Sequence, residues 1–194
     1  KKVLIADVIA KGVNYGFENT DLLSTADAWL VVLCYTLQIY FDFSGYCDMA
    51  IGIAKMFNID LPLNFNSPYK ATSVTDFWKR WHMTLTRFLT KYLYIPLGGN
   101  RKGFARTLCN ILIVYLISGL WHGAAWTFIV WGLMHGIARV FERVTWKYIE
   151  KIPGIIRTVF TFVFINITWV IFRATTIENA FRMYQKMSLT NLWK

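Results

Sequence analysis

The chain has few charged residues, and this scarcity narrows its class before any motif is considered. Charged side chains make up 16% of its 194 residues, against about 25% in an ordinary soluble domain. Hydrophobic residues reach 56% and aromatic residues 18%. This composition predicts an all-α, polytopic integral membrane protein with the lipid bilayer as its partner. The net charge of +10 does not indicate nucleic-acid binding, because Lys and Arg lie between apolar segments, as the positive-inside rule and phospholipid contacts explain.

The chain also lacks the patterns of a metal site or a disulfide framework. Its three cysteines have no CxxC spacing and lie in apolar surroundings. The three histidines, His82, His122 and His135, are far apart in the sequence and form no HExxH pattern. No Ser-His-Asp triad and no internal repeat is visible. We therefore expect neither a metal ion nor a bound cofactor.

The chain begins with Lys1, without an initiator Met or a signal-peptide pattern. Its four or five expected membrane segments would make a thin bundle around any cavity. We therefore interpret residues 1–194 as a single membrane domain fragment, the C-terminal part of a longer protein whose N-terminal helices are missing.

A long apolar run at residues 28–57 predicts a span that runs from outside to inside, because acidic residues precede it and basic residues follow it. Within it, Asp42 and Asp48 are intramembrane carboxylates that need partners. Ion pairing with the basic helix described next is favoured over catalysis. Gly45, between them, indicates either a break or a tight helix contact. A last span is expected at residues 155–172.

Residues 76–94 predict one amphipathic helix at the cytoplasmic interface, preceded by a capping-box pattern at Ser73 and Asp76. Its apolar face would contain Phe77, Trp78, Trp81, Leu85, Phe88, Leu89 and Tyr92. Much of the other side is basic. The cations Lys79, Arg80, Arg87 and Arg101 are candidates for binding the phosphates of a CoA-like donor, although any positive-inside loop would contain such residues.

Residues 107–138 contain no Asp, Glu, Lys or Arg, and basic residues stand at both ends: Arg106 before, and Arg139 and Arg143 after. This pattern predicts a re-entrant helical hairpin whose ends are both cytoplasmic. Arms of about 14 residues would reach only about 21 Å, so the turn that carries His122 should lie inside the bilayer or a funnel.

An ionisable group at membrane depth is a functional-site hypothesis by default. A buried His122 stays neutral at pH 7 and could remove a proton from an acceptor hydroxyl as this attacks a thioester. A structural histidine that hydrogen-bonds a backbone carbonyl at a tight turn fits the spacing equally well. For His135 the structural interpretation is favoured. His82, at the edge of the apolar face, is open to either.

Four separated motifs resemble the membrane-bound O-acyltransferase (MBOAT) family, and within it the bacterial alginate and peptidoglycan O-acetyltransferases. They are Gln38–Tyr46 (QIYFDFSGY), Asp76–His82 (DFWKRWH), Tyr94–Arg101 (YIPLGGNR) and Leu120–Ala124 (LWHGA). The resemblance implies that His122 is the catalytic histidine, that His82 is a second motif histidine, and that the helices form a ring around a tunnel. It also implies a cytoplasmic thioester donor, with acetyl-CoA expected, and a multi-pass location in the bacterial cell membrane. The implied partners are an extracytoplasmic SGNH-type acyltransferase and a polysaccharide acceptor.

Two further hypotheses stay open on physical grounds. A transporter or flippase could use Asp42, Asp48 and His122 as a proton relay. A scaffold for a soluble catalytic partner is the third possibility.

Overall fold

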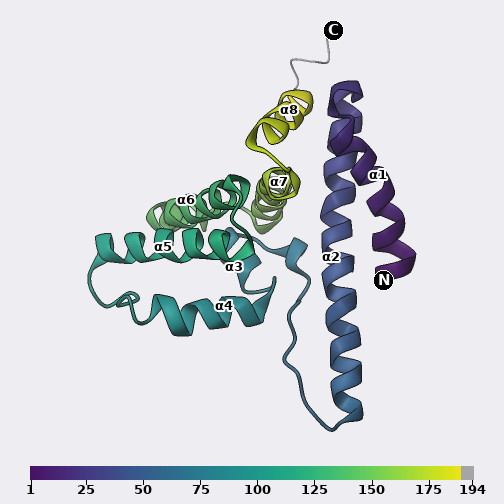
Figure 1. Cartoon of the computed structure of the whole chain (residues 1–194). Coiled ribbons are helices and arrows are strands. Elements are labelled where there is room, and N and C mark those ends of the chain that lie inside the picture. Colours follow the sequence, from purple (N-terminus) through teal and green to yellow (C-terminus); the bar gives the residue numbers. More distant parts are fainter. Residues whose placement is uncertain (189–194) are drawn as a thin grey trace. The chain divides into compact units, whose positions relative to one another are not determined.

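The computed structural model describes residues 1–188, and these residues form helices and no strand (Figure 1). The helices are η1 Lys2–Ala6, α1 Asp7–Glu18, η2 Thr20–Leu22, α2 Thr25–Met56, η3 Pro68–Lys70, α3 Val74–Trp78, α4 Met83–Leu89, η4 Thr90–Tyr94, α5 Phe104–His122, α6 Trp126–Ile149, α7 Gly154–Arg173 and α8 Ile177–Met187. Three of them, α2, α5 and α7, are long and apolar enough to cross a membrane. The predicted all-α, polytopic membrane class is confirmed. The chain divides into two compact units: the first contains Lys1–Pro62 and the C-terminal part from Trp169, and the second contains Leu63–Thr168.

In the first unit, α1 and α2 form a helical hairpin (Figure 1). Helix α2 begins with a capping box, in which Ser24 accepts a hydrogen bond from the Asp27 amide and its own amide donates to the Asp27 carboxylate. The helix passes Gly45 without a break. A Cβ at Gly45 would lie 3.1 Å from the main-chain nitrogen of Lys2. Of the two alternatives for this glycine, the tight helix contact is the one observed.

The two carboxylates of α2 form ion pairs, but not with the basic helix that the sequence suggested. Lys1 Nζ lies 2.6 Å from Asp48 Oδ2, and Lys2 pairs with Asp42. Because η1 packs along α2, the first two lysines reach both carboxylates. All four side chains are exposed in this unit, and an exposed pair contributes only about 0–1 kcal/mol.

The second unit contains the predicted hairpin (Figure 1). Helix α5 ends at His122 and α6 begins at Trp126, so the turn lies where it was expected. The arms are longer than predicted: they have 19 and 24 residues, where the sequence suggested about 14. They extend because Arg106, Arg139 and Arg143, taken as the borders of the hairpin, are themselves helical. At a rise of about 1.5 Å per residue, α5 is about 28 Å long and can cross a bilayer core. The re-entrant placement of the turn stays a prediction.

Two glycines allow α5 and α6 to approach closely. A Cβ at Gly132 would collide with the carbonyl oxygen of Tyr115, and a Cβ at Gly119 with that of Phe128. Small residues at such a crossing let two membrane helices pack backbone against backbone. This packing fixes the turn between the helices.

The single amphipathic helix predicted at residues 76–94 is wrong, because the structure breaks it at His82. Helices α3 and α4 and the π-helical turn η4 share this segment, and His82 has left-handed backbone angles of φ 45° and ψ 53°. The loop before α3 stabilises the break: the Asn66 amide donates to the Arg80 carbonyl, and the Met83 amide to the Asn64 carbonyl. The Ser73 cap was predicted correctly, since its hydroxyl accepts from the Asp76 amide at 3.0 Å. The last span, α7, agrees with the prediction to within a residue at each end.

The structural interpretation of His135 agrees with its surroundings in the core of the second unit. Its side chain has no exposed surface. Trp78 Nε1 lies 3.2 Å from its Nδ1, and Thr168 Oγ1 lies 3.1 Å from its Nε2. Because an indole N–H only donates, Nδ1 accepts and Nε2 holds the proton. His135 therefore links α3 to α7 as a neutral ring.

Candidate active site

His122 occupies the last position of α5, next to the turn into α6. Its Nδ1 lies 2.7 Å from the main-chain oxygen of Ser118, one helical turn earlier. Because a carbonyl only accepts hydrogen bonds, Nδ1 holds the proton and Nε2 holds the lone pair. A structural histidine would make this bond, and a catalytic base needs it, because it fixes the tautomer. The backbone therefore directs the basic nitrogen away from its own helix.

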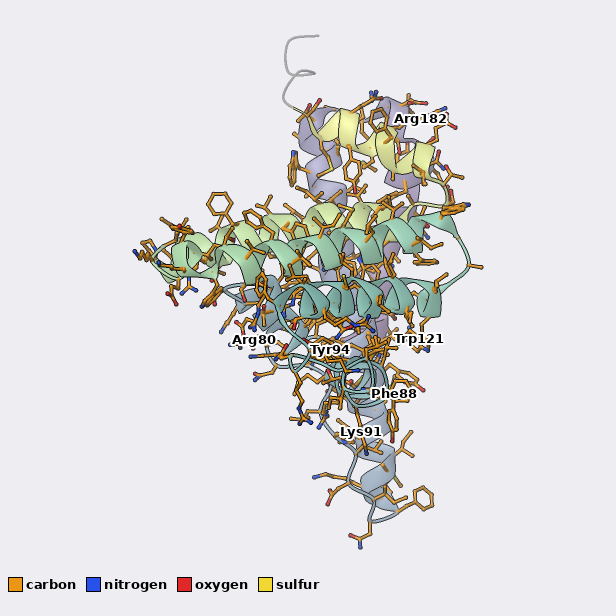
Figure 2. All side chains as sticks on the ribbon, turned by 90° about the vertical axis from the view of Figure 1, so that its left-hand side faces the viewer. Arg80, Phe88, Lys91, Tyr94, Trp121 and Arg182 are labelled. Carbon is orange, nitrogen blue, oxygen red and sulfur yellow. The ribbon has the colours of Figure 1, made fainter. Side chains whose placement is uncertain are left out.

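Aromatic rings surround the His122 imidazole. Trp121 and Trp131 each lie edge-on with ring centroids 4.9 Å away, and Phe128 lies at 6.4 Å. Trp131 is almost fully buried, whereas 60% of Trp121 is exposed. Figure 2 shows Trp121 at the end of α5, where the chain turns into α6. His122 itself is half-buried, which is the environment a reactive base needs.

His82 lies close to this site, at the break between α3 and α4. Its ring centroid is 6.1 Å from that of Trp121, which also contacts His122. The side-chain oxygen of Asn64 lies 3.2 Å from His82 Nδ1 and accepts from the Thr84 hydroxyl at 2.6 Å. Burial, and to a lesser degree a charged His122, lower the pKa of His82 to about 4. His82 is therefore neutral at pH 7.

A narrow cavity of about 300 Å³ lies between α3, α4, α5 and α6. Its apolar wall is formed by Leu85, Leu89, Ile111 and Val114. Ser118, whose carbonyl holds His122, belongs to its lining. Its polar part contains the cations Lys79, Arg139 and Arg143. The cavity thus combines a wall suited to an aliphatic chain with a positively charged region.

A second, wider cavity adjoins the first, and we call it the vestibule. It has a volume of about 660 Å³ and shares Thr75, Lys79, Arg139 and Arg143 with the narrow cavity. Its remaining lining includes Arg157, the acids Asp76 and Glu142, and the aromatic rings of Phe104 and Trp146. Four cations against two acids leave the vestibule positively charged.

The cations of the vestibule differ in how they are compensated. Arg139 forms an ion pair with Glu142 at 3.0 Å. Among the described residues, Lys79 and Arg143 form no ion pair and no side-chain hydrogen bond. Arg157 lies 5.8 Å above the ring of Trp146, and its buried Nε has no hydrogen-bond partner in the described part of the chain. Three positive charges are therefore available to an anionic ligand.

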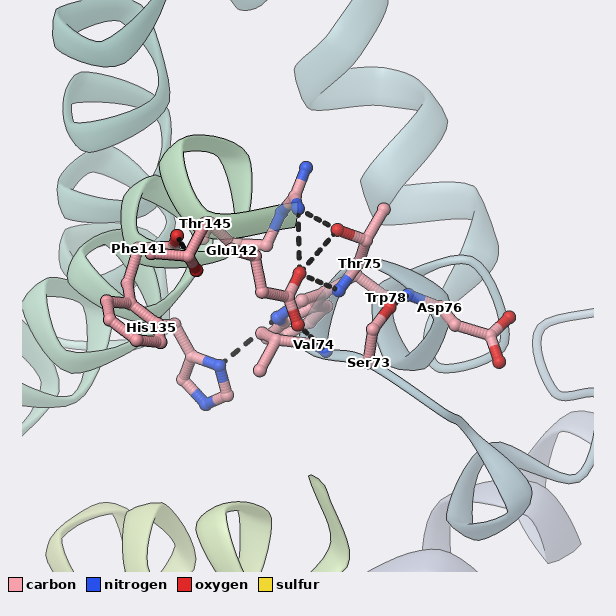
Figure 3. Close-up of polar contacts among 10 residues, drawn as sticks. Ser73, Val74, Thr75, Asp76, Trp78, His135, Phe141, Glu142 and Thr145 are labelled. Carbon is pink, nitrogen blue, oxygen red and sulfur yellow. Dashed lines mark hydrogen bonds and ion pairs between the residues drawn. The ribbon is translucent and has the colours of Figure 1, made fainter. Parts of the chain in front are cut away.

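Glu142 is the most densely bonded carboxylate of the described chain. It accepts hydrogen bonds from the amides of Val74 and Thr75 at the start of α3, and from the Thr75 hydroxyl at 2.6 Å (Figure 3). Arg139 donates to both Thr75 and Glu142. The carboxylate thus connects α3 to α6 at the junction of the two cavities.

Of the four cations predicted to bind a donor, the two cavities include only Lys79. Arg80 forms an ion pair with Asp76 at 2.8 Å, Arg87 is exposed on α4 and donates to its own helix, and Arg101 is exposed in the loop before α5. Sequence reasoning missed Arg139, Arg143 and Arg157 as cavity residues, and it treated the first two as a border of the hairpin. The spacing of four residues between Arg139 and Arg143, which puts them on one helix face, was the available signal.

The carboxylates Asp42 and Asp48 belong to the first unit and His122 to the second. Each carboxylate is paired with a lysine of its own unit. Within the second unit, the structure brings His122 and His82 together.

Comparison with known proteins agrees with the four motifs. The profile of the membrane-bound O-acyltransferase (MBOAT) family matches residues 18–180. The peptidoglycan O-acetyltransferase of Helicobacter pylori is 53% identical over 191 residues, which cover 96% of this chain and 36% of that protein. A probable alginate O-acetylase of Azotobacter vinelandii is 47% identical over 196 residues, covering 100% and 39%. A teichoic acid D-alanyltransferase of Bacillus subtilis is 30% identical over 154 residues, covering 71% and 39%.

The chain therefore spans between a third and two fifths of the length of these relatives. Its share of the family profile nevertheless includes the hairpin, both cavities and the two neighbouring histidines. The resemblance predicted from the sequence is confirmed. This chain belongs to the membrane-bound O-acyltransferase family.

Proposed function

We propose that the protein of which this chain is part is a membrane O-acyltransferase of the bacterial cell membrane, and that His122 is its general base. The observation that carries the proposal is the hydrogen bond from His122 Nδ1 to the Ser118 carbonyl, at a half-buried position beside a cavity with a cationic end. The relatives named as O-acetyltransferases make an acetyl group the expected cargo.

The reaction follows from the tautomer. His122 Nε2 accepts the proton of an acceptor hydroxyl, and the hydroxyl oxygen forms a bond to the thioester carbonyl carbon. The carbon–sulfur bond then breaks, and the thiolate leaves with the proton that the imidazolium returns. Atoms and charge balance, because a thioester and an alcohol become an ester and a thiol. His122 ends neutral and ready for the next cycle.

The donor would enter with its anionic end in the vestibule. Lys79, Arg143 and Arg157 would bind phosphate groups, because arginine forks match phosphate oxygens and none of the three charges has an acidic partner within residues 1–188. The apolar wall of the narrow cavity would contact the methylene groups of the uncharged thioester arm and lead this arm toward Ser118. Acetyl-CoA, which joins phosphates to such an arm, is the donor we expect, arriving from the cytoplasm.

His82 would act as a second catalytic group next to His122. It is neutral at pH 7. The left-handed backbone angles of His82 and the contact of its Nδ1 with the Asn64 side chain orient the ring. If Nδ1 donates to the amide oxygen of Asn64, then Nε2 is an acceptor that can orient the incoming hydroxyl. We propose this positioning of the acceptor as its role.

For the acceptor we propose an extracytoplasmic polysaccharide, reached directly or through an SGNH-type partner protein. Two of the relatives are named for the O-acetylation of peptidoglycan and of alginate. The three helices that are long and apolar enough to cross a membrane support a multi-pass topology. The transporter alternative is not favoured by these relatives, and it would move solute without consuming thioester.

The test is His122→Ala in the full-length protein in proteoliposomes with radiolabelled acetyl-CoA. We expect thioester consumption and O-acetylation to fall by at least about a hundredfold, the usual contribution of a general base. Cys109→Ala, exposed on the same helix and outside both cavities, is the control and should keep wild-type activity. An abundant His122→Ala protein with retained acyl transfer would refute the proposal.

A further inference from the structure

Glu142 has a buried carboxylate that no step of the proposed reaction uses. Only 7% of the residue is exposed. A buried charge is tolerated only when it is paired and hydrogen-bonded. Four donor groups from α3 and α6 converge on its two oxygens. Because all these donors meet at Glu142, the position of its carboxylate is needed either for function or for folding. The location of the hydrogen-bond partners distinguishes these two roles.

The partners of Glu142 lie at the junction between the narrow cavity and the vestibule. Thr75 and Arg139, which both bond to Glu142, line both cavities. Lys79 follows Thr75 one turn later and also lines both. Any ligand that extends from one cavity into the other must pass this junction.

We propose that Glu142 is a positioning residue for the thioester donor, holding the α3 side of this junction against the α6 side. The inference rests on the proposed function, since it assigns a role within the same donor site. By accepting hydrogen bonds from the first amides of α3, Glu142 fixes the position of this helix along its axis and its rotation. The helix has five residues, ends at Trp78 and is followed directly by Lys79. By pairing with Arg139, it fixes the guanidinium between the cavities.

The carboxylate also decides which cations a donor meets. Because Glu142 compensates Arg139, this arginine contributes shape and hydrogen bonds to the junction more than net charge. Lys79 and Arg143 keep their full charge. The net positive charge of the donor site therefore comes from Lys79 and Arg143, which line both cavities, and from Arg157, which lines the vestibule alone and would bind phosphate there.

A carboxylate is required at this position for a physical reason. All its neighbours are donors: two amides, one hydroxyl and one guanidinium. In Glu142→Gln the side-chain NH₂ would face at least one of these donors. It would thus leave buried N–H groups unpaired and release Arg139 from its compensating charge.

Glu142 makes none of its bonds to the base. His122 is held by Ser118, Trp121 and Trp131 at the other end of the hairpin. A disturbed junction should therefore weaken donor binding and leave the chemical step largely unaffected. This separation of KM from kcat is the signature that a residue needed only for folding would not produce.

The experiment measures steady-state kinetics of full-length protein in proteoliposomes with varied acetyl-CoA. For Glu142→Gln we expect the donor KM to rise about tenfold or more, the loss typical of a hydrogen bond to a charged group, with kcat within about threefold of wild type. Thr75→Val removes one shared hydroxyl and should give a smaller KM increase. Glu150→Gln, the same change at an exposed position following α6, should behave as wild type.

A second measurement covers the case in which Glu142→Gln is poorly produced. In Thr75→Val and Glu142→Asp, hydrogen exchange at the amides of Val74 and Thr75 should be faster than in wild type, in parallel with the KM increase. A normal KM in these variants, or a loss of kcat at unchanged KM, would overturn the positioning role. Wild-type protein that consumes no thioester would instead refute the proposed function itself.

Discussion

Replacing Gly132 by alanine tests whether the close helix approach holds the active-site turn in place. The new methyl group would point at the carbonyl oxygen of Tyr115, and the α-carbon of Gly119 lies just beyond. Backbone cannot move aside as a flexible side chain can. We therefore expect α5 and α6 to separate, at an overpacking cost of about 1–3 kcal/mol.

The same substitution also stabilises the helix itself, and this free energy must be subtracted from the overpacking cost. Alanine is favoured over glycine inside a helix by about 0.8–1.0 kcal/mol. The net loss for Gly132→Ala should therefore be up to about 2 kcal/mol. Gly52→Ala, in α2, is the matched control, because a Cβ there would meet nothing within 4 Å. This control should show the gain alone and unfold at a higher temperature than wild type.

Thermal unfolding of the full-length protein in detergent, followed by fluorescence-detected size exclusion, provides the measurement. The double variant Gly119→Ala/Gly132→Ala should lose less than the sum of the single variants, since once the helices have separated the second methyl costs less. Equal midpoints for Gly132→Ala and Gly52→Ala, or strict additivity of the pair, would show that the helices do not depend on this contact.

Two further predictions concern the cations and the second histidine. Arg143→Gln should raise the KM for acetyl-CoA several-fold, because about 1–2 kcal/mol of phosphate interaction is lost. Arg87→Gln, exposed on α4, should leave this KM unchanged. Equal KM values for the two variants, measured from initial rates at varied acetyl-CoA, would exclude Arg143 from the proposed donor site. The pKa of His82 is lowered to about 4 in the folded protein from an ordinary 6.5, so its neutral form contributes stability that is fully present above pH 6.5 and is lost as the pH falls toward 4. The ring signals of His82, assigned by comparison with a His82→Gln variant, should accordingly not titrate between pH 8 and 5 in NMR spectra, and a midpoint near 6.5 would contradict the burial argument.

Several elements of the fold were predictable because hydropathy alone determines them. Helix α7 and the long helix α2 are apolar runs bounded by charge, and both were predicted within a few residues. The turn after His122 was predictable as well, because the uncharged stretch has a glycine-flanked centre between two basic ends. Only the lengths of the arms were wrong, since arginines can continue a helix beyond the apolar core.

The break at His82 was not predictable from local sequence. Residues 76–94 contain neither glycine nor proline, and their apolar periodicity favours one helix. The interruption depends on Asn64 and Asn66, which supply hydrogen bonds from a loop that lies before the segment in the sequence. A tertiary contact of this kind overrides helix propensity and leaves no periodic signal.

The lining of the two cavities was only partly predictable, for a related reason. Lys79, predicted as a donor-binding residue, lines both cavities, whereas Arg139 and Arg143 were assigned to topology. The same positive charge satisfies the positive-inside rule and lines a cavity, and only the packing of α3 on α6 through Glu142 separates these roles. For Asp42 and Asp48, ion pairing was expected and is observed, but the partners are Lys2 and Lys1, at the start of the chain.

The bond between His122 and the Ser118 carbonyl ties the orientation of the imidazole to the secondary structure of α5. An acceptor supplied by the main chain is present whatever side chain occupies position 118, so no point substitution there can delete it. It disappears only when the final helical turn unwinds. Fraying of that terminus would therefore switch the proposed base between aligned and misaligned states. On that proposal, whatever stabilises or loosens the end of the helix, such as lipid thickness or a docked subunit, would govern turnover without touching the imidazole.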